Sequence, residues 1–433
     1  MFETLVNAFK TKEIRVKFLL TLLLLFVYRI GCFIPLPMVD STVVDNLMGG
    51  EFLGILSMMT GGSMQNATLF ALGILPFINS FIIMQLLTLI IPALEKMSKD
   101  GEQGRQKLTQ ITRYVALALG LIQAIGIIVG WKSAITSVFT FEAGWDFPYM
   151  TAICMAIILL AGSTMVMWLG ERITEYGIGN GTSLIIFIGI LSTAGTTMAT
   201  AFNLVGNEWT YIWNILGFIL IIIAIFFFIV FFDLAERRVT VQYSKQVKGN
   251  KMYGGQTTYI PMRINASGVM PIIFASSLVM FPDMIFALFA RGTEAHAWYA
   301  QHMGAGTAPY YVFLTLFIIF FSYFYAQIQF NPDDVSRNIQ QYGGFLPGIR
   351  PGKPTSDFLR KVNNRITFFG AIFLAVLSLV PTFIFQALSA GGVLPFNSAF
   401  SATGLLIVVS VALELNKQLE AQIMMKHYKG FLK

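Results

Sequence analysis

Long apolar runs dominate this chain and constrain what it can fold into. Of its 433 residues, 56% are hydrophobic and only 12% are charged, which is about half the charged fraction of an average soluble domain. About 20 consecutive apolar residues cross a bilayer as a helix. The sequence therefore predicts an all-α polytopic membrane protein with ten spans. These spans lie near residues 18–36, 69–91, 110–131, 150–169, 183–202, 211–233, 265–287, 310–330, 366–388 and 398–415.

One apolar stretch is broken where an unbroken span would be expected. Phe52–Thr60 is apolar but about half the length that a span needs. Gly61, Gly62 and Ser63 then interrupt it, and a full-length span is predicted over Leu69–Ile91. Irregular backbone is tolerated at membrane depth only against protein or a water-filled cavity. We therefore expect the chain to enclose a cavity that holds a short re-entrant helix, at about residues 52–64.

Basic residues follow the predicted topology. Segments outside alternate spans hold 26 of the 29 lysines and arginines, which predicts cytoplasmic N- and C-termini. Two of these segments, at about 234–264 and 331–365, are large and carry six basic residues each. Anionic lipid accounts for part of that charge. The turn-rich sequence at 342–351 also favours docking of a large cytoplasmic partner, either RNA or an acidic protein surface.

The predicted spans divide into two sets of five, joined by a short outer connection at Asn203–Thr210. An odd number of spans in each half gives the halves opposite membrane orientations. That arrangement suits an inverted repeat with a functional path between its halves. We predict an N-terminal half over residues 1–205 and a C-terminal half over residues 206–433.

The predicted span interiors lack the groups that membrane enzymes and coupled transporters use. They contain no histidine and no paired carboxylates, which argues against serine–histidine and aspartyl membrane proteases. Cys32 and Cys154 both lie in spans as packing residues, so neither a disulfide framework nor a cysteine metal site is expected. We predict no catalytic residue, metal or cofactor, and any energy must come from a partner. A protein-conducting channel is favoured, and an inverted-repeat secondary solute transporter is the alternative.

Five segments, spread over both halves, carry a specific resemblance. They are FALGILPFINSFIIMQLLT (70–88), GERITEYGIGNGTSLIIF (170–187), RINASGVMPIIFASS (263–277), NPDDVSRNIQQYGGFLPGIRPGKPT (331–355) and TGLLIVVS (403–410). On these segments the chain resembles the SecY family, the channel subunits of bacterial Sec protein translocases. The resemblance covers essentially the whole chain. It implies a subunit that passes unfolded secretory polypeptides across the cytoplasmic membrane and releases apolar segments sideways into it.

The resemblance also implies an hourglass pore, closed by a ring of aliphatic side chains and blocked from outside by a plug helix. The implied ring positions are Ile74, Ile78, Ile186, Ile273, Ile407 and Thr182. At Thr182 the family more often has an aliphatic residue, so this position departs from the pattern. The implied plug residues are Phe52, Ile55, Leu56, Met58, Met59, Gly61 and Gly62.

A lateral gate between spans two and three and spans seven and eight is implied as well, with Asn79, Gln123 and Phe281 near it. The two basic loops correspond to those that dock a SecA-like motor ATPase or the ribosome. The implied docking residues are Arg237, Arg238, Lys245, Lys248, Lys251, Arg350 and Lys353. Further implied partners are SecE-like and SecG-like membrane subunits, signal sequences and anionic lipids.

Overall fold

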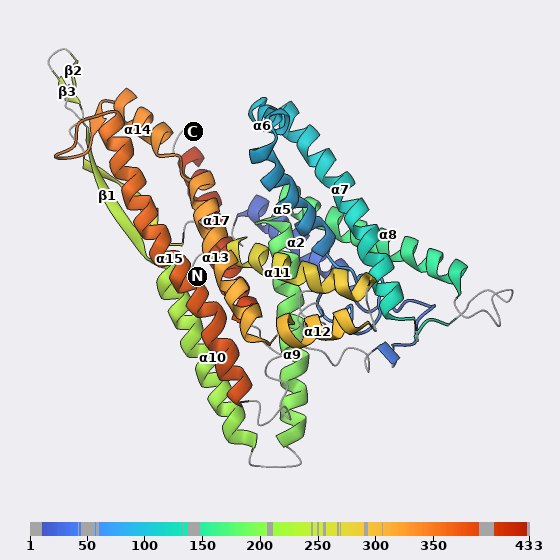
Figure 1. The fold of residues 1–433 in the computed structure, drawn as a ribbon. Helices are drawn as coiled ribbons and strands as arrows, with labels where there is room; N and C mark the ends of the chain where they lie inside the picture. The colour runs from blue at the N-terminus through green and yellow to red at the C-terminus, as the bar shows by residue number, and fades with distance from the viewer. Residues whose placement is uncertain are drawn as a thin grey trace.

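Long helices make up most of the computed structural model (Figure 1). The structure describes residues 11–41, 43–44, 57, 60–132, 134–136, 148–205, 211–243, 246–248, 251–253, 257–265, 268, 270–289, 293–304, 306–388 and 402–430. The helices of the first part are α2 (Lys12–Gly31), α5 (Leu75–Ile90), α6 (Pro92–Lys99), α7 (Gly101–Gly130), α8 (Tyr149–Tyr176) and α9 (Gly181–Val205). The later helices are α10 (Tyr211–Leu234), α11 (Met270–Phe289), α12 (Glu294–Met303), α13 (Ala308–Gln329), α14 (Pro332–Gln341), α15 (Lys353–Leu388) and α17 (Ala402–Gly430).

The described helices make this a multi-pass membrane protein. Among the described residues, six helical stretches are long and apolar enough to cross a membrane, and the number rises to seven if the bent pair α5 and α6 forms one span. Of these stretches, the one in α10 has the highest mean hydropathy, 3.4, and only 17% of it is buried within the chain. Its exposed face is suited to lipid contact. The count of ten spans stays a prediction.

The span predicted over Leu69–Ile91 is wrong at its start. Residues 69–74 form turns, and the helix α5 begins only at Leu75. Gly73 has a φ of 56°, which ordinary residues rarely adopt and which interrupts a right-handed helix. Pro76 then occupies the first turn of α5, where its missing N–H costs nothing. At the other end, α6 continues from α5 at an angle of 102°.

The prediction of a helical fold is confirmed for most of the described residues, but the two large loops also contain a small sheet that it did not include. Strand β1 (Glu236–Tyr243) pairs antiparallel with β4 (Thr257–Arg263), and its end pairs with β5 (Gly344–Phe345). Between β1 and β4, β2 (Gln246–Lys248) and β3 (Lys251–Tyr253) form a small hairpin. In β1, Val239 and Val241 are buried while the residues between and before them are exposed. This period of two is what a half-buried strand requires.

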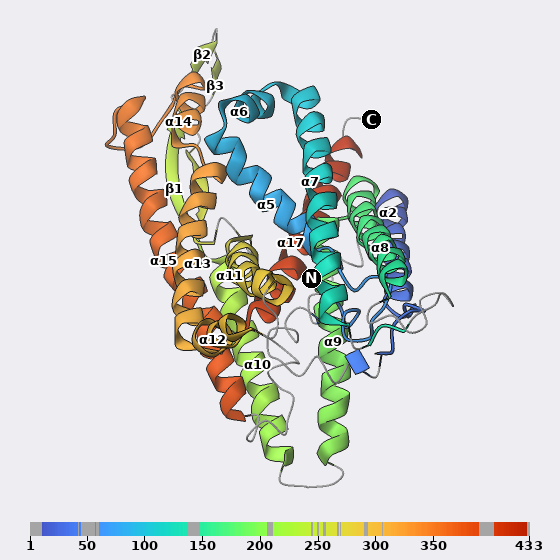
Figure 2. The ribbon, with the colours of Figure 1, turned by 45° about the vertical axis from the view of Figure 1, so that its right-hand side comes forward.

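Two views show how the helices are grouped (Figures 1 and 2). In both, α10, α13 and α15 lie together on one side, and α7 and α8 lie on the other. The largest hydrophobic core joins side chains of α2, α5, α8, α9, α10, α11, α13, α15 and α17. This shared core lies where helices from the early and late parts of the chain meet. The division into two inverted halves stays a prediction.

Candidate functional site

Five isoleucines far apart in the sequence lie in this one buried core. Ile74 caps the start of α5 and Ile78 lies in its first turn, while Ile186, Ile273 and Ile407 come from α9, α11 and α17. Their exposed fractions run only from 2% to 7%. These are the aliphatic positions that the resemblance implies. Three separate helices and the start of a fourth therefore contribute one isoleucine or more to a common apolar centre.

A cavity of about 630 Å³ adjoins this centre and is called the vestibule below. Ile78, Ile186 and Ile273 form part of its lining, so three of the five isoleucines face it. Its remaining lining residues are Phe77, Phe81, Thr109, Arg113, Thr164, Met167, Trp168, Glu171, Arg172, Thr174, Glu175, Asn180, Thr182, Ser183, Met270 and Phe274. The vestibule thus joins an apolar part to a wall that carries charged side chains.

Thr182 lies in the vestibule wall with its hydroxyl group already occupied. The hydroxyl donates to Asn180 Oδ1 at 2.7 Å, and the Thr182 backbone N–H donates to the same oxygen at 3.1 Å. A Cβ added at Gly170 would lie 3.5 Å from both the Thr182 methyl carbon and Ile74 Cδ1. The methyl group of Thr182 and Ile74 Cδ1 therefore both lie next to Gly170, while the hydroxyl of Thr182 is turned to Asn180.

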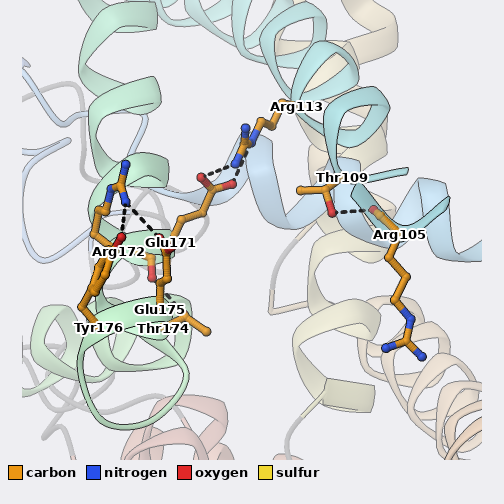
Figure 3. Close-up of polar contacts among 9 residues, drawn as sticks. Arg105, Thr109, Arg113, Glu171, Arg172, Thr174, Glu175 and Tyr176 are labelled. Atoms are coloured by element: carbon orange, nitrogen blue, oxygen red, sulfur yellow. Dashed lines mark hydrogen bonds and ion pairs between the residues drawn. The ribbon is translucent and has the colours of Figure 1, made fainter. Parts of the chain in front are cut away.

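The charged part of the vestibule wall is held by ion pairs (Figure 3). Arg113 of α7 donates through Nε to Glu171 Oε1 at 2.9 Å and through Nη2 to Glu171 Oε2 at 2.7 Å. On α8, Arg172 donates to Glu175 Oε2 at 2.9 Å and to the Tyr176 hydroxyl at 3.3 Å. Two-point arginine–carboxylate contacts fix geometry as well as charge. Within the described residues, no group of three or more His, Cys, Asp or Glu side chains could hold a metal ion.

The break at Gly61 and Gly62 is a turn held by α2. The two glycines have φ values of 68° and 83°, which suit glycine and few other residues. Arg29 Nη1 donates to the Gly61 carbonyl at 3.1 Å, and the Tyr28 hydroxyl donates to the Thr60 carbonyl at 3.4 Å. The other implied plug residues, Phe52, Ile55, Leu56, Met58 and Met59, lie outside the described residues. The plug stays a prediction.

The implied gate residues lie on α5, α7 and α11. Gln123 is buried, and Asn79 and Phe281 are half-buried. All three side chains are described, and no hydrogen bond joins any two of them. A different pair of residues joins α13 to α5 in this region: the Tyr325 hydroxyl donates to Gln85 Oε1 at 2.5 Å. These two residues are 240 positions apart, and no sequence motif indicates that they pair.

The two basic loops form one folded body, called the sheet unit below: β1, β4, β5, α14 and the first turns of α15. Its own core includes Val241 of β1, Ile339 of α14 and Leu359 of α15. Between α14 and α15, Thr355 Oγ1 donates to the Arg350 carbonyl at 2.9 Å, and Ser336 Oγ donates to the Gly352 carbonyl at 2.8 Å. These contacts fix the turn that carries Arg350.

The implied docking residues are spread over the sheet unit and its hairpin. Arg237, Arg350 and Lys353 are exposed. Arg238 donates to Glu236 at 2.8 Å, and this hydrogen bond raises the pKa of the guanidinium further above its usual value. Lys248 and Lys251 are partners in the register of the β2–β3 hairpin. Lys245 lies outside the described residues.

Comparison with known proteins identifies the family. A profile described as SecY matches residues 68–416, which include every described helix from α5 to α15. The chain belongs to the SecY family. The protein translocase subunit SecY of Streptomyces galbus is 40% identical to it over 445 residues, and that of Mycobacterium bovis is 36% identical over 448 residues. In both cases 100% of each chain is covered.

Solved structures share the fold of this SecY-family chain. A structure titled as a protein conducting channel has a TM-score of 0.64 at 18% identity, covering 94% of this chain and 91% of its own. A SecY structure described by its plug domain has a TM-score of 0.62 at 17% identity, with the same coverage. Sec61 in the canine ribosome-channel complex has a TM-score of 0.60 at 17% identity, also with the same coverage. At these identities the likeness concerns the fold.

Membership in the SecY family confirms the resemblance drawn from the five sequence segments and does not favour a solute transporter. Sequence reasoning nevertheless misses the paired charges of the vestibule. In the sequence, Arg113 and Arg172 serve as topology signals. Glu171 and Arg172 also lie in the segment 170–187 that carries the resemblance, but the resemblance implies no role for either. The spacing of Arg172 and Glu175, three residues apart on a helix, is the one available sign of a pair.

Proposed function

We propose that this SecY-family chain is the central channel subunit of a protein translocase. In this role it passes unfolded secretory polypeptides across the membrane and releases apolar segments sideways into the bilayer. The observation that carries the proposal is the vestibule, whose charged wall leads to a centre of buried isoleucines from α5, α9 and α11. A SecY-family chain with this arrangement acts as a channel and not as a catalyst.

The isoleucine centre suits a seal that must yield to any side chain. A narrow apolar constriction excludes water, and with it ions, without holding any passenger segment tightly. A ring of charged residues would instead conduct ions and retain oppositely charged segments. We infer that Ile74, Ile78, Ile186, Ile273 and Ile407 form the constriction. Thr182 contributes its methyl group, because its hydroxyl is already bonded to Asn180.

Sideways release needs a path between helices that can separate. We infer a lateral gate between α5 and α7 on one side and α11 and α13 on the other, with Asn79, Gln123 and Phe281 near it. A passenger segment gains about 25 cal/mol for each Å² of apolar surface that leaves water. This gain offsets the cost of opening, which includes breaking the Tyr325–Gln85 hydrogen bond between α13 and α5.

The sheet unit is the proposed docking site for an energy-supplying partner, either a SecA-like motor ATPase or the ribosome. Arg237, Arg350 and Lys353 are exposed there on a body with its own hydrophobic core. Lys245, Lys248 and Lys251 add to the positive charge, which attracts acidic protein surfaces and RNA. Arg238, the remaining proposed docking residue, is paired with Glu236. The solved Sec61 with a similar fold comes from a ribosome-channel complex. SecE-like and SecG-like subunits would complete the assembly in the membrane.

We further propose a bacterial cytoplasmic-membrane location with ten spans, cytoplasmic termini and two inverted halves, over residues 1–205 and 206–433. Residues 52–64 would form the plug, which includes the Gly61–Gly62 turn that Arg29 and Tyr28 hold. The positive φ values of both glycines suit a hinge at this point. Signal sequences and anionic lipids are the remaining proposed ligands.

Crosslinking tests the path directly. Single cysteines would replace Ile78, Ile407 or Ile223 in a chain whose Cys32 and Cys154 are changed to Ala. Ile223 is the matched control, because it lies on α10 and is 64% exposed. A secretory chain stalled in transit should crosslink at positions 78 and 407 and not at 223. Equal crosslinking at all three positions, or crosslinking at 223 alone, would contradict the proposed pore.

A further inference from the structure

The vestibule wall carries four charged side chains in the described part of the chain, and they form two closed pairs. Arg113 meets both carboxylate oxygens of Glu171 at 2.9 and 2.7 Å, and Arg172 meets Glu175 at 2.9 Å. Two arginines and two glutamates leave this wall without net formal charge. The part of the lining that comes from α11 consists of Met270, Ile273 and Phe274, all of them uncharged.

In each pair the arginine makes more than one contact. Arg113 and Glu171 come from different helices, and their two-point contact ties α7 to α8 (Figure 3). Arg172 is held additionally by the Tyr176 hydroxyl and lies over the Trp168 ring, 5.6 Å from its centroid. Exposed ion pairs add little stability in general. Stabilisation of the fold is therefore not a sufficient reason for these two ion pairs.

We propose that these two pairs keep the vestibule electrically neutral, so that passenger segments of either charge cross it without being held. The proposal rests on the proposed channel function and extends it to the charge of the passenger. An unpaired arginine in a partly enclosed cavity would attract acidic segments, and an unpaired glutamate would attract basic ones. A cavity through which many different sequences pass avoids both kinds of attraction if each charged side chain of its wall is paired with one of opposite charge.

The proposal predicts that the two single variants retain passengers of opposite charge, which a purely structural role of the pair would not do. Glu171→Gln leaves the Arg113 guanidinium without its carboxylate partner, so acidic passengers should be retained. Arg113→Gln leaves the Glu171 carboxylate unpaired, so basic passengers should be retained instead. We expect about a fivefold change for each, the effect of one charge pair at contact distance in bulk water. If water is excluded from the vestibule, the expected change is larger than fivefold.

The experiment uses inverted membrane vesicles in which the full chain is the sole channel of its family, supplied with cell extract and ATP. One secretory polypeptide is prepared in three forms that carry a central cluster of Glu, Lys or Gln. The measured quantity is the translocation rate of each charged form divided by that of the Gln form. Glu171→Gln should lower the Glu ratio about fivefold, and Arg113→Gln should lower the Lys ratio about as much.

The exchanged double variant, Arg113→Glu with Glu171→Arg, is the decisive control. It restores a neutral pair, so both ratios should return towards those of the unmodified chain. The proposal is overturned if both single variants slow all three passengers in equal proportion, which a packing defect would do, or if neither ratio changes. Failure of the unmodified chain to translocate even the Gln form would instead contradict the proposed channel function.

Discussion

The vestibule wall and the sheet unit both carry arginines, and they use them in opposite ways. In the vestibule, Arg113 and Arg172 each close on a glutamate. On the sheet unit, Arg237, Arg350 and Lys353 are exposed, and the described residues include no ion pair to any of the three. One region neutralises its charge within the chain, and the other leaves part of its charge available to a partner.

This difference follows from what each region would touch. A passenger has no fixed sequence, so a transport path works best when no charge on its wall prefers one segment over another. A docking partner has a fixed surface, so unpaired cations add to its encounter rate and orientation. An arginine that is paired with a glutamate of the same chain therefore adds no net charge, whereas an unpaired arginine attracts an acidic surface. The predictions below change charge or pairing at chosen residues.

The largest effect is expected on the docking side. Arg350→Glu reverses an exposed charge on the turn that Thr355 and Ser336 fix. Placing like charges together across an interface costs several kcal/mol, so partner-driven export should fall about a hundredfold. The measurements are passenger protection in vesicles and translocation-coupled ATP hydrolysis.

Arg337→Glu is the matched control for this change, because Arg337 is exposed on α14 of the same sheet unit but lies off the turn. It should reduce export much less than the change at position 350. Normal stimulation of ATP hydrolysis by the Arg350→Glu chain would show that this turn is not the docking point.

A smaller effect is expected from placing an unpaired polar group in the apolar centre. Ile407 is 3% exposed, and Ile407→Asn would bury an amide among isoleucines. An unpaired amide costs about 1–3 kcal/mol in such a place, so the hydrated population of the seal should rise about tenfold. Ion conductance of vesicles without passenger measures this rise. Ile407→Val, which keeps the site apolar, should leave the conductance near that of the unmodified chain.

The sequence predicts the apolar centre better than the charged wall. Ile74 and Ile78 lie four residues apart in a segment that matches a family motif, so their positions can be assigned through the resemblance. Arg113 and Glu171 are 58 residues apart on two helices, and their contact depends on the relative rotation and depth of α7 and α8. Apolar periodicity indicates which face of a helix is buried but does not set its height against a neighbour.

The sheet unit escapes prediction for a different reason. Its basic residues indicate a charged docking loop and give no sign of a sheet. Val239 and Val241 nevertheless alternate with exposed residues in the pattern of a strand. The pairing of β1 with β5 joins Gln242 to Phe345 across more than 100 residues of chain, and no local signal encodes it. Likewise, the late start of α5 follows from the positive φ of Gly73, which a composition window reads as part of an apolar run.

The smallest effect is expected where an internal pair carries no formal charge. The Tyr325 hydroxyl donates to Gln85 across α13 and α5, and Tyr325 is 4% exposed. Tyr325→Phe removes the hydrogen bond and keeps the ring against Phe274. Hydrogen bonds between membrane helices average about 0.6 kcal/mol, so release of a marginally apolar segment into lipid should rise about threefold. Glycosylation or protease mapping of passengers with graded apolar segments measures this release.

Tyr114→Phe is the matched control, because Tyr114 is 71% exposed on α7. If Gln85→Met and Tyr325→Phe had fully additive effects when combined, the two groups would act independently, and internal pairing in this chain would matter only where charge is involved.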